Sequence, residues 1–440
     1  MQSQEVCMET GNPLPVLFLL TFLLFPVMLD GQGIVINDDL TLTGQIRIRS
    51  EFDGKDFDNN SDLVERSQMR TRLGILFTGL EKTDIFLQIQ DSRNLGTNSA
   101  GLVNDNNLGI HQAYIKFQCR LWDRLTWQIG RFESRYGRER LIGAVGWHNV
   151  GRTFDGLRLE FDFDLFNADL FLLKINDRSF DTAKYSGHSG DENLYGLYTR
   201  WLEDHLHLFI LADVDHSKVQ QGHSGRYKYR KNIWTAGMFY QRDTDWGLDI
   251  ALDAAYQFGS HFEADYPDVS AYMIAAEIGY QSNEKSQPRI ALGFDITSGD
   301  ELHSQGPEWT DNERNSFYNL FYTGHAFRGY MDYFITGPQF GLSDWYLKFS
   351  FQPADRFELM SHVHYFLSMN TGKVIPDNDF YWPIRFDKYG FEFDLTGKMQ
   401  IYDQLTGQLG MSLFLPNAKW LDGMHDDLGT WFYLMFTANI

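Results

Sequence analysis

The chain alternates apolar and polar residues over long stretches. Residues 40–52 read LTLTGQIRIRSEF, in which apolar residues such as Ile46 fall on one parity and Arg47 and Arg49 on the other. A strand with this alternation has one apolar face and one charged face. Eighteen such segments occur, the first at 40–52 and the last at 430–439, and most have ten to fourteen residues. A typical globular strand has only about five to six residues, whereas a tilted strand needs about nine to eleven to cross a bilayer.

The connections between these segments alternate between short and long. The short ones include 79–82, 202–204 and 353–355, and the long polar ones include 53–68, 93–109, 133–154, 178–192, 216–231, 298–341 and 368–387. This pattern predicts an all-β fold: a transmembrane antiparallel up-and-down β-barrel of about 18 strands, with short periplasmic turns and long extracellular loops. Lipid-exposed strands must leave no open edge, so the sheet is expected to close.

A soluble β-sandwich or propeller is the main alternative. It would show shorter strands at a regular spacing of about eight to twelve residues, or blade repeats of about 40 to 50 residues. The sequence contains no such repeat, and its aromatic residues also favour a membrane, where they form girdles at the two interfaces. These residues lie at or near segment ends: Trp127, Trp201, Trp234, Trp246, Tyr272, Tyr280, Trp345, Tyr365 and Trp431.

The N-terminus carries an uncharged apolar run from Leu14 to Leu29. Its length suits a secretory signal and is short for a membrane-spanning helix. We therefore expect residues 1–32 to be a cleaved signal peptide and 33–440 to form a single outer-membrane barrel domain. A non-cleaved anchor helix is the alternative.

Charge is distributed unevenly along the chain. The net charge is −21, which argues against a nucleic-acid partner. Residues 111–160 nevertheless hold nine Lys and Arg against five Asp and Glu, a local excess of four positive charges. Parity directs a basic set into the lumen early in the chain: Arg47, Arg49, Arg70, Arg72, Lys116, Arg120 and Arg158. It directs a mainly acidic set inward later: Asp249, Asp253, Glu277, Asp295, Glu358, Glu392 and Asp394. Walls of opposite sign predict a transverse field across the pore.

The alternation breaks at two places that lead into long loops. Asp91 and Arg93 share parity with Ile89, which should face lipid, and Arg131 likewise follows Ile129. Either the strand ends before these residues or a bulge re-aims their side chains. The second break enters an arginine-rich loop, which suggests a mouth or constriction.

The loop 298–341 is the longest connection and is rich in aromatic residues, which would be unusual in a loop surrounded by water. They are Trp309, Phe317, Tyr318, Phe321, Tyr322, His325, Phe327 and Tyr330. We expect this loop to fold inward or over the mouth and to narrow the pore.

Metal and catalytic chemistry leave weaker signals. The pairs His205/His207 and His362/His364 each share a strand face and could bind a metal, but such pairs more often line a wet lumen, so no metal site is expected. The GxSxG, HExxH and CxxC motifs are absent. We expect no catalytic residue and no cofactor, with a hydrolase at the barrel rim or an adhesion barrel as alternatives.

Two blocks of sequence carry a family resemblance. The chain resembles the alginate export family of outer-membrane barrels in both blocks. The first block runs from AYIKFQCRLW to FDGLRLEF and is accompanied by the upstream RTRLG and QDSRNLG. The second is FYNLFYTGHAFRGYMDYF at 317–334. The resemblance implies an eighteen-stranded barrel that conducts an anionic uronate polysaccharide through an arginine-lined constriction gated by loops. Matched residue by residue, the constriction set is Arg70, Arg72, Asp91, Arg93, Arg131, Arg135, Arg138, Arg140, Arg152, Asp155 and Arg158. Arginine suits this role because it stays charged and offers a planar fork that matches carboxylates.

The sequence thus predicts a channel in the outer membrane of a Gram-negative cell that passes hydrophilic, anionic saccharide-type solutes by diffusion. A general porin for small solutes with a transverse field is the alternative. The expected partners are membrane lipid and an anionic polysaccharide or small hydrophilic solute, with periplasmic export partners left open. A monomer is expected.

Overall fold

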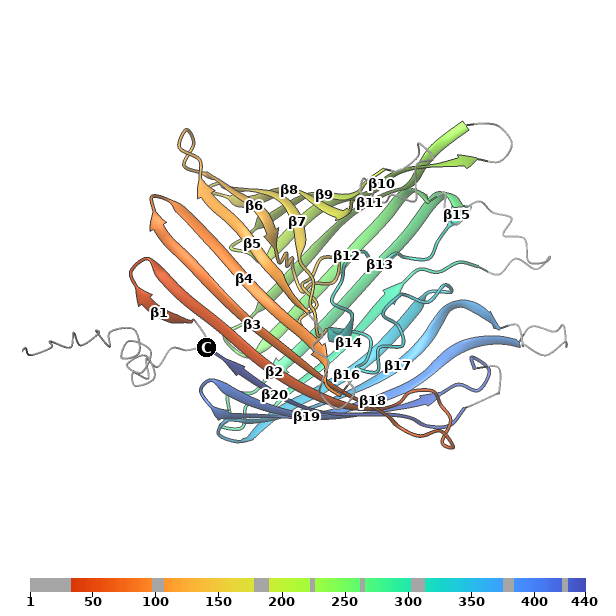
Figure 1. Cartoon of the computed structure of the whole chain (residues 1–440). Helices are drawn as coiled ribbons and strands as arrows, with labels where there is room; N and C mark the ends of the chain where they lie inside the picture. The colour runs from red at the N-terminus through yellow and green to blue at the C-terminus, as the bar shows by residue number, and fades with distance from the viewer. Residues whose placement is uncertain are drawn as a thin grey trace, which may run out of the picture.

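The computed structural model describes residues 33–96, 107–177, 190–221, 226–261, 266–301, 313–374, 384–421 and 426–440. The expected signal peptide 1–32 lies outside these residues. The described part forms one antiparallel sheet that closes where β2 pairs with β20, from Gln45 opposite Asn439 to Gly54 opposite Thr430. Figure 1 shows the tilted strands, with the C-terminus at the end that carries the short turns.

Twenty strands are present in the described residues, but two of them are short additions: β1 (Ile34–Asn37) forms a hairpin with β2, and β15 (Glu313–Arg314) runs parallel to β13. Subtracting these two leaves the eighteen barrel strands that the sequence predicted. The first nine are β2 (Leu40–Gly54), β3 (Val64–Leu80), β4 (Thr83–Asn94), β5 (Leu108–Gln118), β6 (Leu125–Phe132), β7 (Phe154–Asp162), β8 (Phe166–Asn176), β9 (Glu192–Trp201) and β10 (Leu206–Gln221). The other nine are β11 (Arg226–Asp243), β12 (Leu248–His261), β13 (Tyr266–Gln281), β14 (Arg289–Thr297), β16 (Leu342–Ala354), β17 (Phe357–Val374), β18 (Ile384–Tyr402), β19 (Leu405–Pro416) and β20 (Gly429–Asn439).

The alternation in the sequence becomes the two faces of the barrel wall. Ile46 and Leu73 are 46% and 50% exposed, whereas Arg47 and Arg70, which follow the opposite parity, are only 4% exposed. Exposed apolar side chains on every second position form the outer surface that meets lipid, and the polar side chains face the interior. Within the described residues, no helix has the length and apolar character needed to cross a membrane.

Two expected loops are largely strand. β10 continues to Gln221 and β11 begins at Arg226, so most of 216–231 is paired sheet, and β17 likewise extends to Val374 into the expected loop 368–387. The polar composition of these segments predicted loops, but strands that project beyond the membrane need no apolar face and can be polar on both sides.

Two connections fold into the barrel interior. We call 133–153, between β6 and β7, the first inner segment, and 315–341, between β15 and β16, the second inner segment; the latter includes a short 3₁₀ turn, η4 (Gly324–Ala326). Backbone hydrogen bonds join them, from Gly143 N to Phe321 O and from Phe321 N to Leu141 O, both 2.9 Å. The described part of the long aromatic loop therefore folds inward as expected. Trp309 lies outside the described residues.

Each inner segment has its own apolar cluster against the wall. Leu141 and Ile142 of the first segment pack with Phe132, Tyr198 and other residues of β6–β13. Residues of the second segment pack against β16–β20: Met331 and Phe334 contact a buried group that includes Phe366, Phe414 and Trp431. Burial of this apolar area fixes both segments between opposite sides of the barrel.

Candidate functional site

A group of four arginines lines the inner face of β2 and β3. We call Arg47, Arg49, Arg70 and Arg72 the arginine patch. Arg47 lies directly opposite Arg70 in the register of the two strands. Alternation explains why all four point inward, because each is separated from the next on its strand by one outward residue.

The first inner segment covers the arginine patch with its backbone. Arg47 donates to Gly146 O (2.8 Å) and His148 O (3.2 Å), and Arg49 donates to Trp147 O (2.6 Å). Arg70 donates to Gly146 O and His148 O, both at 3.1 Å. The patch thus holds the segment through charge-assisted hydrogen bonds to carbonyl oxygens.

Few carboxylates neutralise the patch. Arg49 pairs with Glu51 at 2.6 Å and Arg72 with Glu133 at 3.2 Å. Burial alone would raise the pKa of Glu133, but hydrogen bonds from His111 and Arg135, together with nearby guanidinium charges, lower that pKa to about 2. Among the described residues no carboxylate lies within ion-pair distance of Arg47 or Arg70, so this side of the lumen keeps an excess of positive charge.

The opposite wall is acidic and binds arginines of the inner segments. Asp253 on β12 contacts Arg138 (2.8 Å) and Arg140 (3.1 Å) of the first segment. Asp295 on β14 is 1% exposed and contacts both Arg140 and, at 3.1 Å, Arg328 of the second segment. The first inner segment therefore spans the lumen: its carbonyls accept from the basic wall, and its arginines pair with the acidic wall.

The remaining inward residues of the predicted set also have partners. Arg135 contacts Glu133 and Glu139, both at 2.8 Å, and Arg152 donates to Phe321 O of the second inner segment. On the wall, Lys116 pairs with Glu160 (2.7 Å) and Arg158 contacts the same carboxylate (3.1 Å). The structure thus brings ten of the predicted residues to the lumen wall or the first inner segment: Arg47, Arg49, Arg70, Arg72, Lys116, Arg135, Arg138, Arg140, Arg152 and Arg158.

Five predicted residues lie elsewhere. Asp91 and Arg93 form an ion pair on β4, on the face of Met69 and Ile89, and Arg131 pairs with Asp155 at 2.7 Å on the face of Ile129. The side chains of the second pair are about half exposed. The β4–β5 pairing shifts register between Gln88 and Ile89, but this irregularity does not turn Asp91 and Arg93 inward, because the β3–β4 register stays regular there. The β6–β7 register is also regular at Arg131, and each charge meets its partner outside, near the long-loop end. Arg120 is exposed in the turn after β5.

A cavity of about 530 Å³ adjoins the arginine patch. Its charged walls include Arg49, Lys55, Arg66, Arg152, Glu51, Asp53 and Asp332, and its ring-bearing walls include Trp147, His148, Tyr322, His325 and Trp431. The Arg49 guanidinium lies 4.1 Å from the Trp147 ring, which also stacks on His325 at 4.1 Å. Arg66 shares the parity of Arg70, but it lies in 53–68, for which the sequence predicts a long loop, whereas β3 already begins at Val64.

A closed barrel with an apolar outer surface and a charged lumen defines an outer-membrane β-barrel channel. Solved structures with the same fold include OpdL of Pseudomonas aeruginosa (13% identity, TM-score 0.58, covering 92% of this chain and 99% of that one). OccK11 (OpdR) of the same organism has 12% identity and a TM-score of 0.57, covering 91% and 95%. A BenF-like porin from Pseudomonas fluorescens has 9% identity and a TM-score of 0.56, covering 92% and 100%. No curated protein matches the chain.

Residues 38–418 match the family described as alginate export, and the chain belongs to that family. The protein is therefore a porin-like channel of the Gram-negative outer membrane, surrounded by lipid and open to small solutes. Its family and its structural neighbours are passive channels rather than enzymes.

Proposed function

We propose that this channel passes anionic, uronate-type saccharides by diffusion past the arginine patch. The observation that carries the proposal is the cavity beside the patch, where guanidinium groups and aromatic rings line the same wall. Guanidinium groups bind the carboxylates of a uronate, and aromatic faces stack on apolar groups. The unneutralised charge of Arg47 and Arg70 adds an attractive potential for anions at the same place.

Arg66 is the group best placed to test this proposal. It is exposed, it lines the cavity, and it has no ion-pair partner among the described residues. Removing the Arg66 charge therefore leaves no buried carboxylate without its ion-pair partner. A charge-assisted contact contributes about 1.5–3 kcal/mol, so Arg66→Gln should weaken binding of a uronate oligomer by about tenfold or more.

The measurement is planar-bilayer conductance under a salt gradient, with uronate oligomers and neutral oligosaccharides of the same length added in turn. We expect anion-selective reversal and blocking by the uronates only, with weaker blocking in Arg66→Gln. Arg131→Gln is the matched control, because Arg131 is a half-exposed arginine on the outer face. Equal blocking by neutral sugars, or equal loss in both variants, would contradict the proposal. Weak selectivity without blocking would instead favour a general porin for small solutes.

A further inference from the structure

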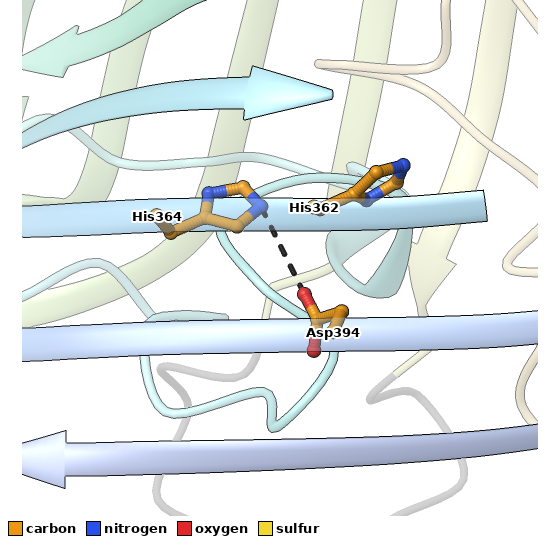
Figure 2. A group of neighbouring side chains, drawn as sticks. All are labelled: His362, His364 and Asp394. Carbon is orange, nitrogen blue, oxygen red and sulfur yellow. Dashed lines mark ion pairs between the residues drawn. The ribbon is translucent and has the colours of Figure 1, made fainter. Parts of the chain in front are cut away.

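Two histidines and an aspartate meet on the inner face of β17 and β18. His362 lies directly opposite Asp394 in the register, and His364 lies opposite Glu392. One ligand atom each from His362, His364 and Asp394 can be chosen so that all three lie within 4.8 Å of one another. Figure 2 shows the two rings on one strand and the carboxylate on its neighbour. The sequence pattern shows the histidine pair but not the register that brings Asp394 to it.

The ring of His364 is oriented as in many metal sites. Its Nδ1 is 2.9 Å from the Asp344 carboxylate, and its Nε2 is 3.9 Å from Oδ2 of Asp394 (Figure 2). In the neutral ring, the first contact is a hydrogen bond in which Nδ1–H donates to Asp344, and this tautomer leaves Nε2 as an acceptor for a metal. The second distance is too long for a hydrogen bond. Histidine ligands of metals usually donate their other ring N–H to a carboxylate in this manner.

Two buried carboxylate oxygens at this place accept no hydrogen bond from any described residue. Oδ2 of Asp394 and Oε2 of Glu392 accept no hydrogen bond, and both residues are only 1% exposed. Two neighbouring carboxylates in such an environment need a compensating charge. Lys348 lies opposite His362 on the other side, but its ammonium is 2.9 Å from Glu277. The unpaired oxygens therefore point to a cation that binds between the strands.

We propose that His362, His364 and Asp394 form a binding site for a divalent transition metal of the zinc type. Two imidazoles and one carboxylate are a common zinc ligand set, and the fourth position is left for water. Ligand atoms about 2.0–2.2 Å from a tetrahedral zinc lie about 3.3–3.6 Å apart, so small side-chain rotations would close the present separations. This mixed nitrogen and oxygen set disfavours calcium and magnesium, which prefer oxygen ligands alone.

The site lies against the second inner segment. The Tyr330 ring is 5.2 Å from the His362 ring, and Met331 N donates to Oε1 of Glu392 at 2.8 Å. A bound metal would supply positive charge next to the Glu392 carboxylate and stiffen the wall on which this segment rests. The proposal does not depend on which solute the channel passes.

Metal binding can be measured directly on the folded barrel purified without a polyhistidine tag and stripped with a chelator. We expect one Co²⁺ or Zn²⁺ ion per chain, with a cobalt absorption spectrum typical of nitrogen ligands. His364→Gln and Asp394→Asn should abolish this binding. Asp344→Asn, which removes only the orienting carboxylate, should weaken it by about 10- to 100-fold. His205→Gln is the matched control, because His205 lies outside the cluster and its Nδ1–H donates to Gln241 O at 2.9 Å.

Heat-modifiable migration on gels reports whether each variant is folded. His362→Gln provides a second test because His362 is only partly buried, so its loss should leave the barrel intact. Absence of stoichiometric binding to the folded wild type would overturn the proposal and imply that a shared proton satisfies the carboxylates. Binding that survives both His362→Gln and His364→Gln would overturn it as well.

Discussion

Arg47 and Arg70 face each other across β2 and β3, and both donate a hydrogen bond to the carbonyl oxygen of Gly146, at 2.8 Å and 3.1 Å. Like charges directly opposite each other on a sheet repel. Here the backbone of the first inner segment stabilises both charges at once. An anionic solute that reaches the patch would compete with these carbonyl oxygens, so solute binding and docking of the segment are expected to be coupled.

Arg70→Gln is expected to loosen the first inner segment. The substitution removes charge-assisted hydrogen bonds to Gly146 O and His148 O, which contribute about 1.5–3 kcal/mol. Relief of the repulsion from Arg47 offsets part of this loss. Single-channel recordings should therefore show more frequent transitions to a larger conductance.

The exposed Arg124 provides the control for this experiment. It lies in the short turn between β5 and β6 and pairs with Asp164 in the turn between β7 and β8. Arg124→Gln should leave the recordings unchanged. If Arg70→Gln behaves like Arg124→Gln, the arginine patch does not hold the segment in place.

Asp295→Asn is expected to destabilise the protein strongly. Asp295 is almost fully buried and neutralises both Arg140 and Arg328, so its loss leaves two buried guanidinium groups without this carboxylate. Breaking a buried pair from one side costs about 3–5 kcal/mol. Asp155→Asn, at a half-exposed pair on the outer face, should cost less than about 1 kcal/mol.

The free energy of unfolding of both variants can be measured in detergent by denaturant titration, or their melting temperatures compared by thermal scans. A similar loss of stability in the two would mean that Asp295 does not anchor the inner segments.

Most of the fold follows from the sequence because membrane strands repeat one simple rule. Alternation placed Arg47, Arg49, Arg70 and Arg72 inside and Ile46 outside, and the structure has them there. The same rule, applied without interruption, also gives the outward face of Arg131, so the placement of its side chain in the constriction set was wrong, although the arginine-rich segment that follows it does fold into the lumen. An ion pair with Asp155 makes an outward charge tolerable outside the apolar band.

The contacts of the inner segments could not be derived in this way. Arg47 donates to backbone carbonyl oxygens, and because every residue has such an oxygen, the residue pattern does not indicate this contact. The salt bridge between Arg140 and Asp253 joins residues 113 positions apart, and the proximity of Asp394 to His362 depends on the register of one strand pair. Such long-range contacts depend on loop docking and strand register rather than on local propensity.

Acidic pH is expected to loosen the first inner segment through His148. The Nδ1 atom of His148 accepts a hydrogen bond from Val150 N at 3.2 Å, which requires this nitrogen to be unprotonated. Burial, followed by the charges of Arg49 and Arg47, lowers the pKa of His148. The docked ring thus binds fewer protons than a free ring. Docking is most stable above the ordinary histidine pKa of about 6.5 and weakens as the pH falls below it.

Channel recordings between pH 8 and pH 5 test this dependence. The frequency of opening should rise below about pH 6.5 in the wild type and stay flat in His148→Gln, which cannot be protonated. An identical rise in both proteins would assign the effect to another group.

Gly329→Ala is expected to displace the second inner segment. Gly329 has φ +81°, a conformation that L-residues rarely adopt, and an added Cβ would lie 2.4 Å from a carboxylate oxygen of Glu392. The backbone strain costs about 1–3 kcal/mol, and the clash adds to it. Gly96→Ala separates the two effects, because Gly96 has φ +79° and the described residues place no atom within 4 Å of the added Cβ. Limited proteolysis within 315–341 should be faster in Gly329→Ala than in Gly96→Ala, whereas equal rates would show that the contact with Glu392 does not position this segment.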